Sequence, residues 1–497
     1  MATRRKFLEE SGGGEVGSEW MGAPSWRGDP RDKWVSLAQK RHKENQLDEA
    51  IRCYNRVLRA SSDRSGVIEH AGFRRGMVEC LCAKGEYSQA LVIVEEMKRY
   101  LFSEVTSISK ELERIRLLAA TINLQIGSYR AAELECRHLL QDGGDDREGE
   151  QMREILMTLG SISLYQGDLL LARRYYEDCL NYLGDKDKSL ELAKVLNHLA
   201  QLHFIETEWA EALELLTRSL RISESLGDGR LTASVIGNMG TVQLLMGEWA
   251  EAEENLKRSL DMWEGLGDLL AIVRKYISLG NLCTMRREWK KADDYYSRSR
   301  TISREKGYKR ELALACEFSG ELAFDEGKLD LARRYYNEAL ALVKEIAPEG
   351  DLMGEIYRRI AEVQVKTGDL TGALESCERS HGFSLRMRDR YEEGIVYRVF
   401  GQIYEAWGET ERARSYFSQG IDSLAAIGEQ YERGKTLYEA ALFLTDRYAS
   451  PGDFRTAERH FREAAAIFGH LGVEYFSEMI RKGEDRLRRK QTAPSPA

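Results

Sequence analysis

Two short stretches match patterns of nucleotide-binding loops. Residues 12–17 read GGGEVG, which satisfies G-x-G-x-x-G, and residues 434–436 read GKT, the end of a phosphate-binding loop. The first pattern needs a strand before it and a helix after it, yet it lies in a polar Gly/Ser segment. The second lacks the first Gly of its motif, because that position is Glu429. We therefore expect neither stretch to bind a nucleotide.

Metal ligands and nucleophiles are also poorly placed. His198 and His203 lie five residues apart, about 140° around a helix, so they do not converge on a metal. Cys80 and Cys82 lack a second ligand pair at zinc spacing. The eight cysteines are scattered through helical patterns, which is typical of free buried thiols in a reducing compartment. We expect no metal, no cofactor and no catalytic activity.

A Glu-Trp pair occurs three times at a spacing of forty residues. The stretches read TEWAEALELLTRSL from Thr207, GEWAEAEENLKRSL from Gly247 and REWKKADDYYSRSR from Arg287. None of them offers a general base beside a nucleophile, whereas each has an Ala three residues after the Trp. The triplicate therefore indicates a repeated structural element and not a repeated active site.

The same pattern recurs along most of the chain. A turn residue is followed five residues later by Ala in eleven copies, with 40 to 44 residues between successive turns: Asn45/Ala50, Gly85/Ala90, Gly127/Ala132, Gly167/Ala172, Thr207/Ala212, Gly247/Ala252, Arg287/Ala292, Gly327/Ala332, Gly368/Ala373, Gly408/Ala413 and Gly452/Ala457. A fixed period of this size predicts a solenoid. It overrides the three or four domains that length alone suggests.

Each repeat reads as two helices joined at the turn residue. A small residue lies seven positions before most turns, where it lets the second helix approach closely, and an apolar residue lies two positions after nearly every turn. In several repeats a Gly about twenty positions after the turn suits a left-handed helix C-cap, as at Gly227, Gly267, Gly307, Gly428 and Gly472. No useful β-alternation separates the repeats, so we expect an all-α fold.

This pattern resembles the tetratricopeptide repeat. The resemblance is carried by the small residue Gly240, the turn residue Gly247, the corner aromatic Trp249, and the small residues Ala252 and Ser259. It implies a right-handed superhelical solenoid of about eleven repeats. The period is forty rather than about 34 residues, and the Pro that usually ends the second helix is absent. The chain is thus similar to the long-repeat subclass of kinesin light chains, polarity adaptors and bacterial regulators, and its superhelical pitch remains open.

The resemblance divides the chain into four parts. Residues 31–472 would form the solenoid, and residues 473–490 a polar-faced helix that caps its end, as solenoids require. Residues 1–30 and 491–497 are expected to be disordered tails.

One column of the first helices is polar in every repeat. It comes directly after the small residue and contains Gln39, Glu79, Thr121, Ser161, Gln201, Thr241, Asn281, Glu321, Glu362, Gln402 and Asp446. In the family that the chain resembles, this column faces the concave groove that takes peptides. The alternative is that the column simply faces solvent, in which case it would be polar without binding anything.

Arginines precede this column in some repeats. Family members that grip a C-terminal carboxylate have Lys or Arg four residues before the column and Asn within it, in neighbouring repeats. Here Arg75, Arg358 and Arg398 hold the earlier position, but Asn281, the column's only Asn, lies elsewhere. This clamp is therefore not present as a set. Arg358, Arg359 and Arg398 would form either a basic patch for an acidic peptide or a solvated helix face.

Charge and hydropathy narrow the function further. The net charge of −9 and pI of about 5.7 give no general attraction to nucleic acid or to an anionic membrane. No apolar run approaches the ~20 residues that span a bilayer, and no signal-peptide core is present, so we expect a cytoplasmic protein. We interpret it as a non-catalytic scaffold or adaptor that binds a peptide or protein segment. The alternative is a ligand- or peptide-sensing module that acts through a separate output partner, and the oligomeric state is open.

Overall fold

The computed structural model describes residues 30–60, 67–101, 109–142, 149–183, 189–350, 352–447 and 451–492. Over these ranges the chain forms 23 α-helices and no strand, which confirms the all-α prediction. The Gly-rich stretch at residues 12–17 lies outside the described residues, as do both expected tails apart from Pro30, Gln491 and Thr492, which are helical. None of the helices in the described ranges is long and apolar enough to cross a bilayer.

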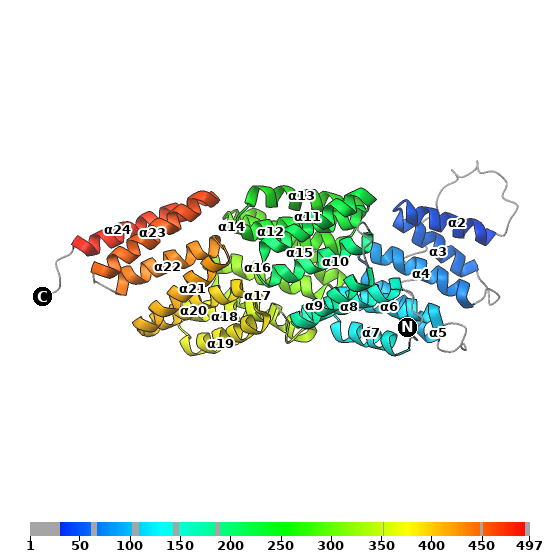
Figure 1. Ribbon diagram of the computed structural model, residues 1–497, viewed down its shortest axis with the longest axis horizontal. Coiled ribbons are helices and arrows are strands. Elements are labelled where there is room, and N and C mark those ends of the chain that lie inside the picture. Colours follow the sequence, from blue (N-terminus) through cyan, green and yellow to red (C-terminus); the bar gives the residue numbers. More distant parts are fainter. Residues whose placement is uncertain are drawn as a thin grey trace.

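The helices alternate as a first helix (A) and a second helix (B) of eleven repeats, arranged along one long axis (Figure 1). The A helices are α2 (Pro30–Lys43), α4 (Val67–Ala83), α6 (Ser109–Gln125), α8 (Gly149–Gln166), α10 (Leu190–Ile205), α12 (Gly229–Met246), α14 (Leu269–Met285), α16 (Lys309–Asp325), α18 (Leu352–Thr367), α20 (Arg390–Trp407) and α22 (Tyr431–Arg447). The B helices are α3 (Leu47–Ala60), α5 (Tyr87–Leu101), α7 (Tyr129–Asp142), α9 (Leu169–Leu183), α11 (Trp209–Leu226), α13 (Trp249–Leu266), α15 (Trp289–Lys306), α17 (Leu329–Ile346), α19 (Leu370–Met387), α21 (Thr410–Ala426) and α23 (Pro451–Leu471). Helix α24 (Glu474–Thr492) follows the last repeat.

The two helices of a repeat meet where a small side chain on A faces a larger one on B. A Cβ added to Gly280 or Gly320 would collide with the ring of Tyr296 or Tyr336, and both rings are fully buried. Near the other end of the contact, Ser259 of α13 is fully buried and donates a 2.7 Å hydrogen bond to the carbonyl of Ala233 on α12. The small residues predicted from the sequence therefore set the close approach of A and B.

The turn between A and B has a fixed backbone conformation. Ten of the eleven predicted turn residues have positive φ, including the non-glycine residues Asn45, Thr207 and Arg287, whose φ values are 57°, 62° and 61°. This left-handed conformation is costly for residues with a Cβ, so the tight A–B corner imposes it. The exception is Gly452, which lies inside α23 and not in a turn, because the last repeat has 44 residues.

Successive superhelical turns touch each other. The side-chain amide of Asn45 donates to the carbonyl of Leu266, 221 residues later, and Ser88 donates to the carbonyl of Lys306, 218 residues later. Lys306 also forms a 2.6 Å ion pair with Glu86. Repeat one thus contacts repeat six, and repeat two contacts repeat seven, so one superhelical turn takes about five repeats. We call this contact between turns the seam.

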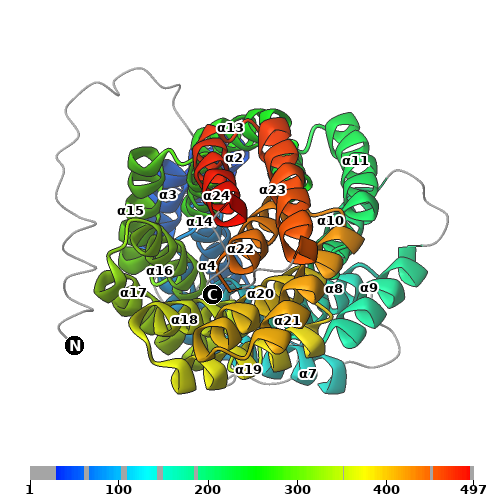
Figure 2. The same cartoon turned by 90° about the vertical axis from the view of Figure 1, so that its left-hand side faces the viewer.

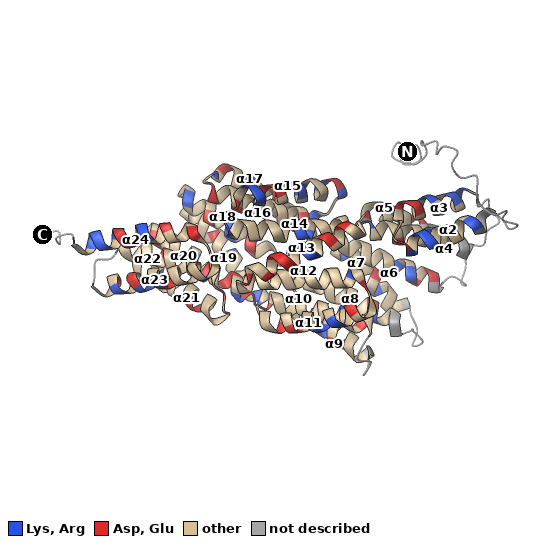
Figure 3. Cartoon of the chain, turned by 90° about the horizontal axis from the view of Figure 1, so that it is seen from above, with Lys and Arg blue, Asp and Glu red and all other residues tan. Residues whose placement is uncertain are grey.

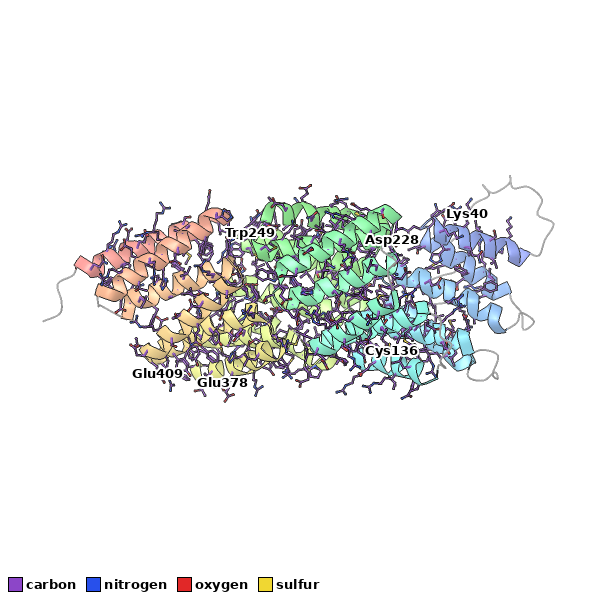
Figure 4. The ribbon with its side chains drawn as sticks, viewed as in Figure 1. Lys40, Cys136, Asp228, Trp249, Glu378 and Glu409 are labelled. Atoms are coloured by element: carbon purple, nitrogen blue, oxygen red, sulfur yellow. The ribbon has the colours of Figure 1, made fainter. Side chains whose placement is uncertain are left out.

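The three Glu-Trp copies lie along the seam. Trp209 and Trp249 are each 5% exposed, which confirms that they fill the helix corner. They also pack against the start of an A helix in the next superhelical turn: the ring centroids of Trp209 and Tyr391 are 6.2 Å apart, and those of Trp249 and Tyr431 are 5.8 Å apart. Figure 4 labels Trp249 where α13 approaches the C-terminal helices.

The third copy meets the capping helix. The Arg287 guanidinium lies 4.8 Å from the ring centroid of Trp289 and 4.7 Å from that of Tyr475 on α24. Phe476 of α24 stacks on Phe468 of α23 with ring centroids 3.9 Å apart. Helix α24 therefore covers the last repeat and also contacts the preceding superhelical turn at the seam.

Candidate functional site

The A helices line the inside of the superhelix. Viewed along the long axis, B helices such as α9, α11, α17 and α19 lie outermost, and A helices such as α4, α14, α20 and α22 lie nearer the axis (Figure 2). Each A helix also contacts the A helix of the next repeat, as α18 contacts α20. Acidic and basic residues are both spread along the whole length (Figure 3).

Four consecutive A helices leave a cavity of about 420 Å³ on this inner surface. We call it the N-terminal groove. Its lining residues all come from α4, α6, α8 and α10: Arg75, Glu79, Arg114, Leu117, Leu118, Thr121, Leu124, Gln125, Glu154, Met157, Thr158, Ser161, Lys194 and His198. Three residues of the predicted column, Glu79, Thr121 and Ser161, are therefore brought together here.

The remaining lining residues share the helix face of that column. Arg114, Leu117, Leu118 and Thr121 of α6 lie at i, i+3, i+4 and i+7, and the same spacing recurs on α8. Residues at these spacings project from one face of a helix. The sequence analysis found two positions of this face, the column and the position four residues before it, and missed the other two. Applying helical spacing to the column would have found them.

The polar groups of the N-terminal groove are only partly paired with one another. Arg75 forms a 2.8 Å ion pair with Glu111 and lies 3.6 Å from Glu79. Arg114 lies 3.7 Å from Glu111. Lys194 has no ion pair or hydrogen bond to any described residue. The ammonium group of Lys194 is thus unpaired among the described residues, and it lies beside the apolar floor of the groove.

His198 lies beside Lys194 in the N-terminal groove. Its ring stacks on Tyr176 with centroids 5.4 Å apart, and its buried Nδ1 has no hydrogen-bond partner among the described residues. Burial, followed by the charge of Lys194, lowers the pKa of His198 to about 4. The imidazole is therefore neutral at pH 7, so it can donate or accept a hydrogen bond in the groove without adding a charge there.

The C-terminal half of the inner surface is filled by its own ion pairs. Arg358 and Arg398 are 3% and 2% exposed, so the interpretation of a solvated face or accessible basic patch is wrong for both. Arg358 Nε lies 2.6 Å from Glu392, and Arg398 pairs with Glu432. Carboxylates of neighbouring repeats neutralise these arginines. The sequence analysis missed these carboxylates because they lie on other helices than the arginines.

Arg359 and Glu362 extend this network. Arg359 lies 2.7 Å from Glu321, and Glu362 lies 3.3 Å from Arg358 and 3.6 Å from Arg398. Although burial alone raises the pKa of Glu362, the three arginines hold it below its ordinary value. Glu321 and Glu362 of the predicted column are therefore committed to internal pairs.

Other members of the column have internal partners as well. Thr241 donates to the carbonyl of Gly237, Asn281 accepts a 2.7 Å hydrogen bond from Tyr296, and Gln402 donates to Glu439. Gln201 lies three residues after His198 on α10, and Gln39 is exposed on α2. Whether any column residue contacts a partner stays a prediction, and the N-terminal groove is an open part of the described surface.

Three further candidates from the sequence are now placed. The GKT stretch lies inside α22, which confirms that it is no phosphate-binding loop. All eight cysteines are free and seven are buried. His203, Glu206 and Glu208 gather within 4.8 Å, but His203 hydrogen-bonds Glu208 at 2.6 Å and Glu206 pairs with Arg173. These three side chains already have partners.

Comparison with known proteins agrees with this geometry. Residues 151–305 match the sequence model of the tetratricopeptide repeat in three overlapping windows, 151–225, 191–265 and 231–305. No curated protein sequence matches the chain.

Several solved structures are similar to the chain at low sequence identity. One is a Rap protein complexed with Competence and Sporulation Factor, with 14% identity and a TM-score of 0.53, covering 72% of this chain and 99% of that one. Another is the Rap conjugation gene regulator of the plasmid pLS20 in complex with the Phr* peptide, with 12% identity and a TM-score of 0.47, covering 71% and 94%. Yeast Tom70 has 14% identity and a TM-score of 0.37, covering 94% and 92%.

The matched windows coincide with helices α8 to α15, which are four complete helix pairs. The same pair, with its left-handed turn residue, recurs on both sides of the windows. Residues 151–305 are therefore tetratricopeptide repeats, and equivalent helix pairs continue the all-α solenoid on both sides of them.

Proposed function

We propose that this chain is a non-catalytic binding protein that holds an extended peptide or protein segment in the N-terminal groove. One observation carries the proposal. Four neighbouring A helices leave about 420 Å³ open on the inner surface, whereas the equivalent helices of the C-terminal half fill their surface with internal ion pairs. A concave site with an apolar floor and a few polar groups is the usual form of a binding pocket.

The lining of the groove favours a segment with an apolar residue next to an acidic one. Leu117, Leu118 and Met157 supply apolar contact, and Met adapts its shape to different partners. Lys194 would pair with a carboxylate of the segment. The Rap protein of similar fold is described as complexed with Competence and Sporulation Factor, and this analogy supports binding only at the level of the fold.

Affinity capture followed by mass spectrometry tests the proposal. The full chain would be compared with Thr121→Arg, which fills the groove, and Lys194→Glu, which reverses its free charge. Glu177→Lys is the control, because Glu177 is exposed on the B helix α9. Partners retained by wild type and control but lost by both groove variants would support the groove. Unchanged partners in groove variants that keep the wild-type melting curve would overturn it.

A further inference from the structure

A second cavity lies between the B helices α21 and α23, with α22 beneath it. It measures about 410 Å³ and has an apolar floor that includes Phe417, Phe443 and Leu444. None of its lining residues belongs to the N-terminal groove or to the predicted column. We call it the α21–α23 cavity.

Two buried nitrogens that line this cavity lack partners. Arg433 Nε on α22 and His460 Nδ1 on α23 are both inaccessible to solvent and have no hydrogen-bond partner among the described residues. A buried polar group without a partner costs about 1–3 kcal/mol, and both of these groups belong to residues that line one cavity. The Arg433 side chain is 31% exposed, and its guanidinium is always a donor.

The wall formed by α22 and α23 carries more positive than negative charge. Arg433 lies 3.2 Å from Glu463, and Arg459 lies 4.0 Å from the same carboxylate. Two guanidinium groups thus share one Glu. The third arginine of the lining, Arg414, is paired separately with Asp453 at 2.8 Å.

The opposite wall, on α21, has one acidic group. Asp422 is exposed and lies 3.5 Å from the hydroxyl of Ser418. Burial, followed by the charge of Arg459, lowers the pKa of His460, so the ring is neutral at pH 7. The positive charge of the α22–α23 wall is therefore on Arg433 and Arg459, and Asp422 faces this wall from α21.

We propose that the α21–α23 cavity binds a small carboxylic acid with an apolar body. Its carboxylate would pair with the exposed part of the Arg433 guanidinium and lie beside His460, and its apolar part would pack on Phe417 and Phe443. The volume lies within the range of about 300–1,000 Å³ that is usual for small-molecule sites. Carboxylate bound by guanidinium is a charge-assisted and therefore strong interaction.

This site is independent of the function proposed for the N-terminal groove, since the two cavities lie on different repeats and on different helix faces. A ligand here would bridge α21, α22 and α23, and thus join the last two repeats. The proposal can fail while the groove proposal stands, and the reverse also holds.

Isothermal titration calorimetry on the full chain tests the proposal with two matched probes, 3-phenylpropanoate and 3-phenylpropanamide. They share the apolar body and differ in the charged head. Arg433→Gln removes the guanidinium, and Ala425→Phe fills the cavity from its rim, where Ala425 is exposed. Arg462→Gln is the control, because Arg462 is exposed on the same helix α23 and does not line the cavity.

We expect the acid to bind wild type and Arg462→Gln in the millimolar range or tighter. Wild type should bind the amide about tenfold more weakly than the acid, or weaker still, as loss of a hydrogen bond to a charged group predicts. Arg433→Gln and Ala425→Phe should each bind the acid about tenfold more weakly than wild type does, or weaker still. Melting curves would verify that each variant is folded. Absence of acid binding to wild type, equal binding of the amide, or unchanged binding by folded Ala425→Phe would each overturn the proposal.

Discussion

At the scale of single residues, the inner surface holds a carboxylate that is buried without a hydrogen-bond partner. Glu317 on α16 is fully buried, and neither of its oxygens has a hydrogen-bond partner among the described residues. Its closest cation is Arg359, at 3.7 Å. Burial raises the pKa of Glu317 to about 7, although Arg359 and Arg358 oppose this rise. The folded chain therefore keeps a proton here that the unfolded chain releases near the ordinary value of 4.5.

This difference predicts a pH dependence of stability. Since the folded pKa is the higher one, the stabilising effect of the proton is complete below pH 4.5 and is lost as the pH rises through about 7. Glu317→Gln cannot ionise, so its stability relative to wild type should rise by about 1–3 kcal/mol between pH 5 and pH 8. Chemical denaturation at both pH values measures this change. Glu378→Gln, on the exposed side of α19 (Figure 4), is the control, and equal pH profiles for both variants would contradict the prediction.

Single residues also show the limit of prediction from the sequence. The polar column was found because it recurs with the repeat, and part of it does line the N-terminal groove. The repeat pattern could not show whether Arg358 and Arg398 are free or paired. Their partners Glu392 and Glu432 lie 34 residues later on neighbouring A helices. Whether an arginine is free depends on such pairs, and no local pattern defines them.

At the scale of helices, packing within a repeat is the part that sequence predicts well. The small residue on A faces the larger residue on B, and the sizes of the two differ between repeats. Gly320 faces Tyr336 in repeat eight, whereas the same positions hold Ala200 and Leu216 in repeat five, which are both buried. Each pair fills the same space between two helices, and the period alone reveals the positions.

Exchanging these pairs tests their complementarity. Gly320→Ala should lower the free energy of unfolding by about 1–3 kcal/mol, because the new Cβ would collide with the ring of Tyr336. Combining it with Tyr336→Leu recreates the pair of repeat five and should restore part of that loss. A double-mutant cycle by chemical denaturation measures the coupling. Purely additive effects would show that the two positions do not share space.

At the scale of the whole molecule, the seam is what the sequence did not predict. Adjacent repeats follow from the forty-residue period, but the pitch that brings residues about 220 apart into contact depends on small rotations between repeats. A signal was nevertheless present. Tyr391, Tyr431 and Tyr475 lie in the first turns of α20, α22 and α24, at spacings of 40 and 44 residues. They face Trp209, Trp249 and Arg287. Two matching triplets, five repeats apart, mark the two sides of the seam.

The seam should hold the superhelix in its compact form. Each pair of aromatic rings contributes about 0.5–1.5 kcal/mol beyond the apolar area that it buries, so removing two of them weakens the contact between turns. Packing within each repeat and with its neighbours would remain, because solenoid repeats are stabilised mainly by adjacent repeats. We therefore expect Tyr391→Ala with Tyr431→Ala to lengthen the molecule while it keeps its helical content.

Small-angle X-ray scattering and circular dichroism measure these two quantities on the same samples. Tyr416→Ala is the matched control, because Tyr416 stacks on Phe400 and Tyr404 of its own repeat and does not reach the other superhelical turn. The seam variant should show a larger maximum dimension than both wild type and Tyr416→Ala, with equal helical signal in all three. A scattering profile identical to wild type would mean that nearest-neighbour packing alone sets the pitch, and that the Trp–Tyr contacts follow from the superhelix without maintaining it.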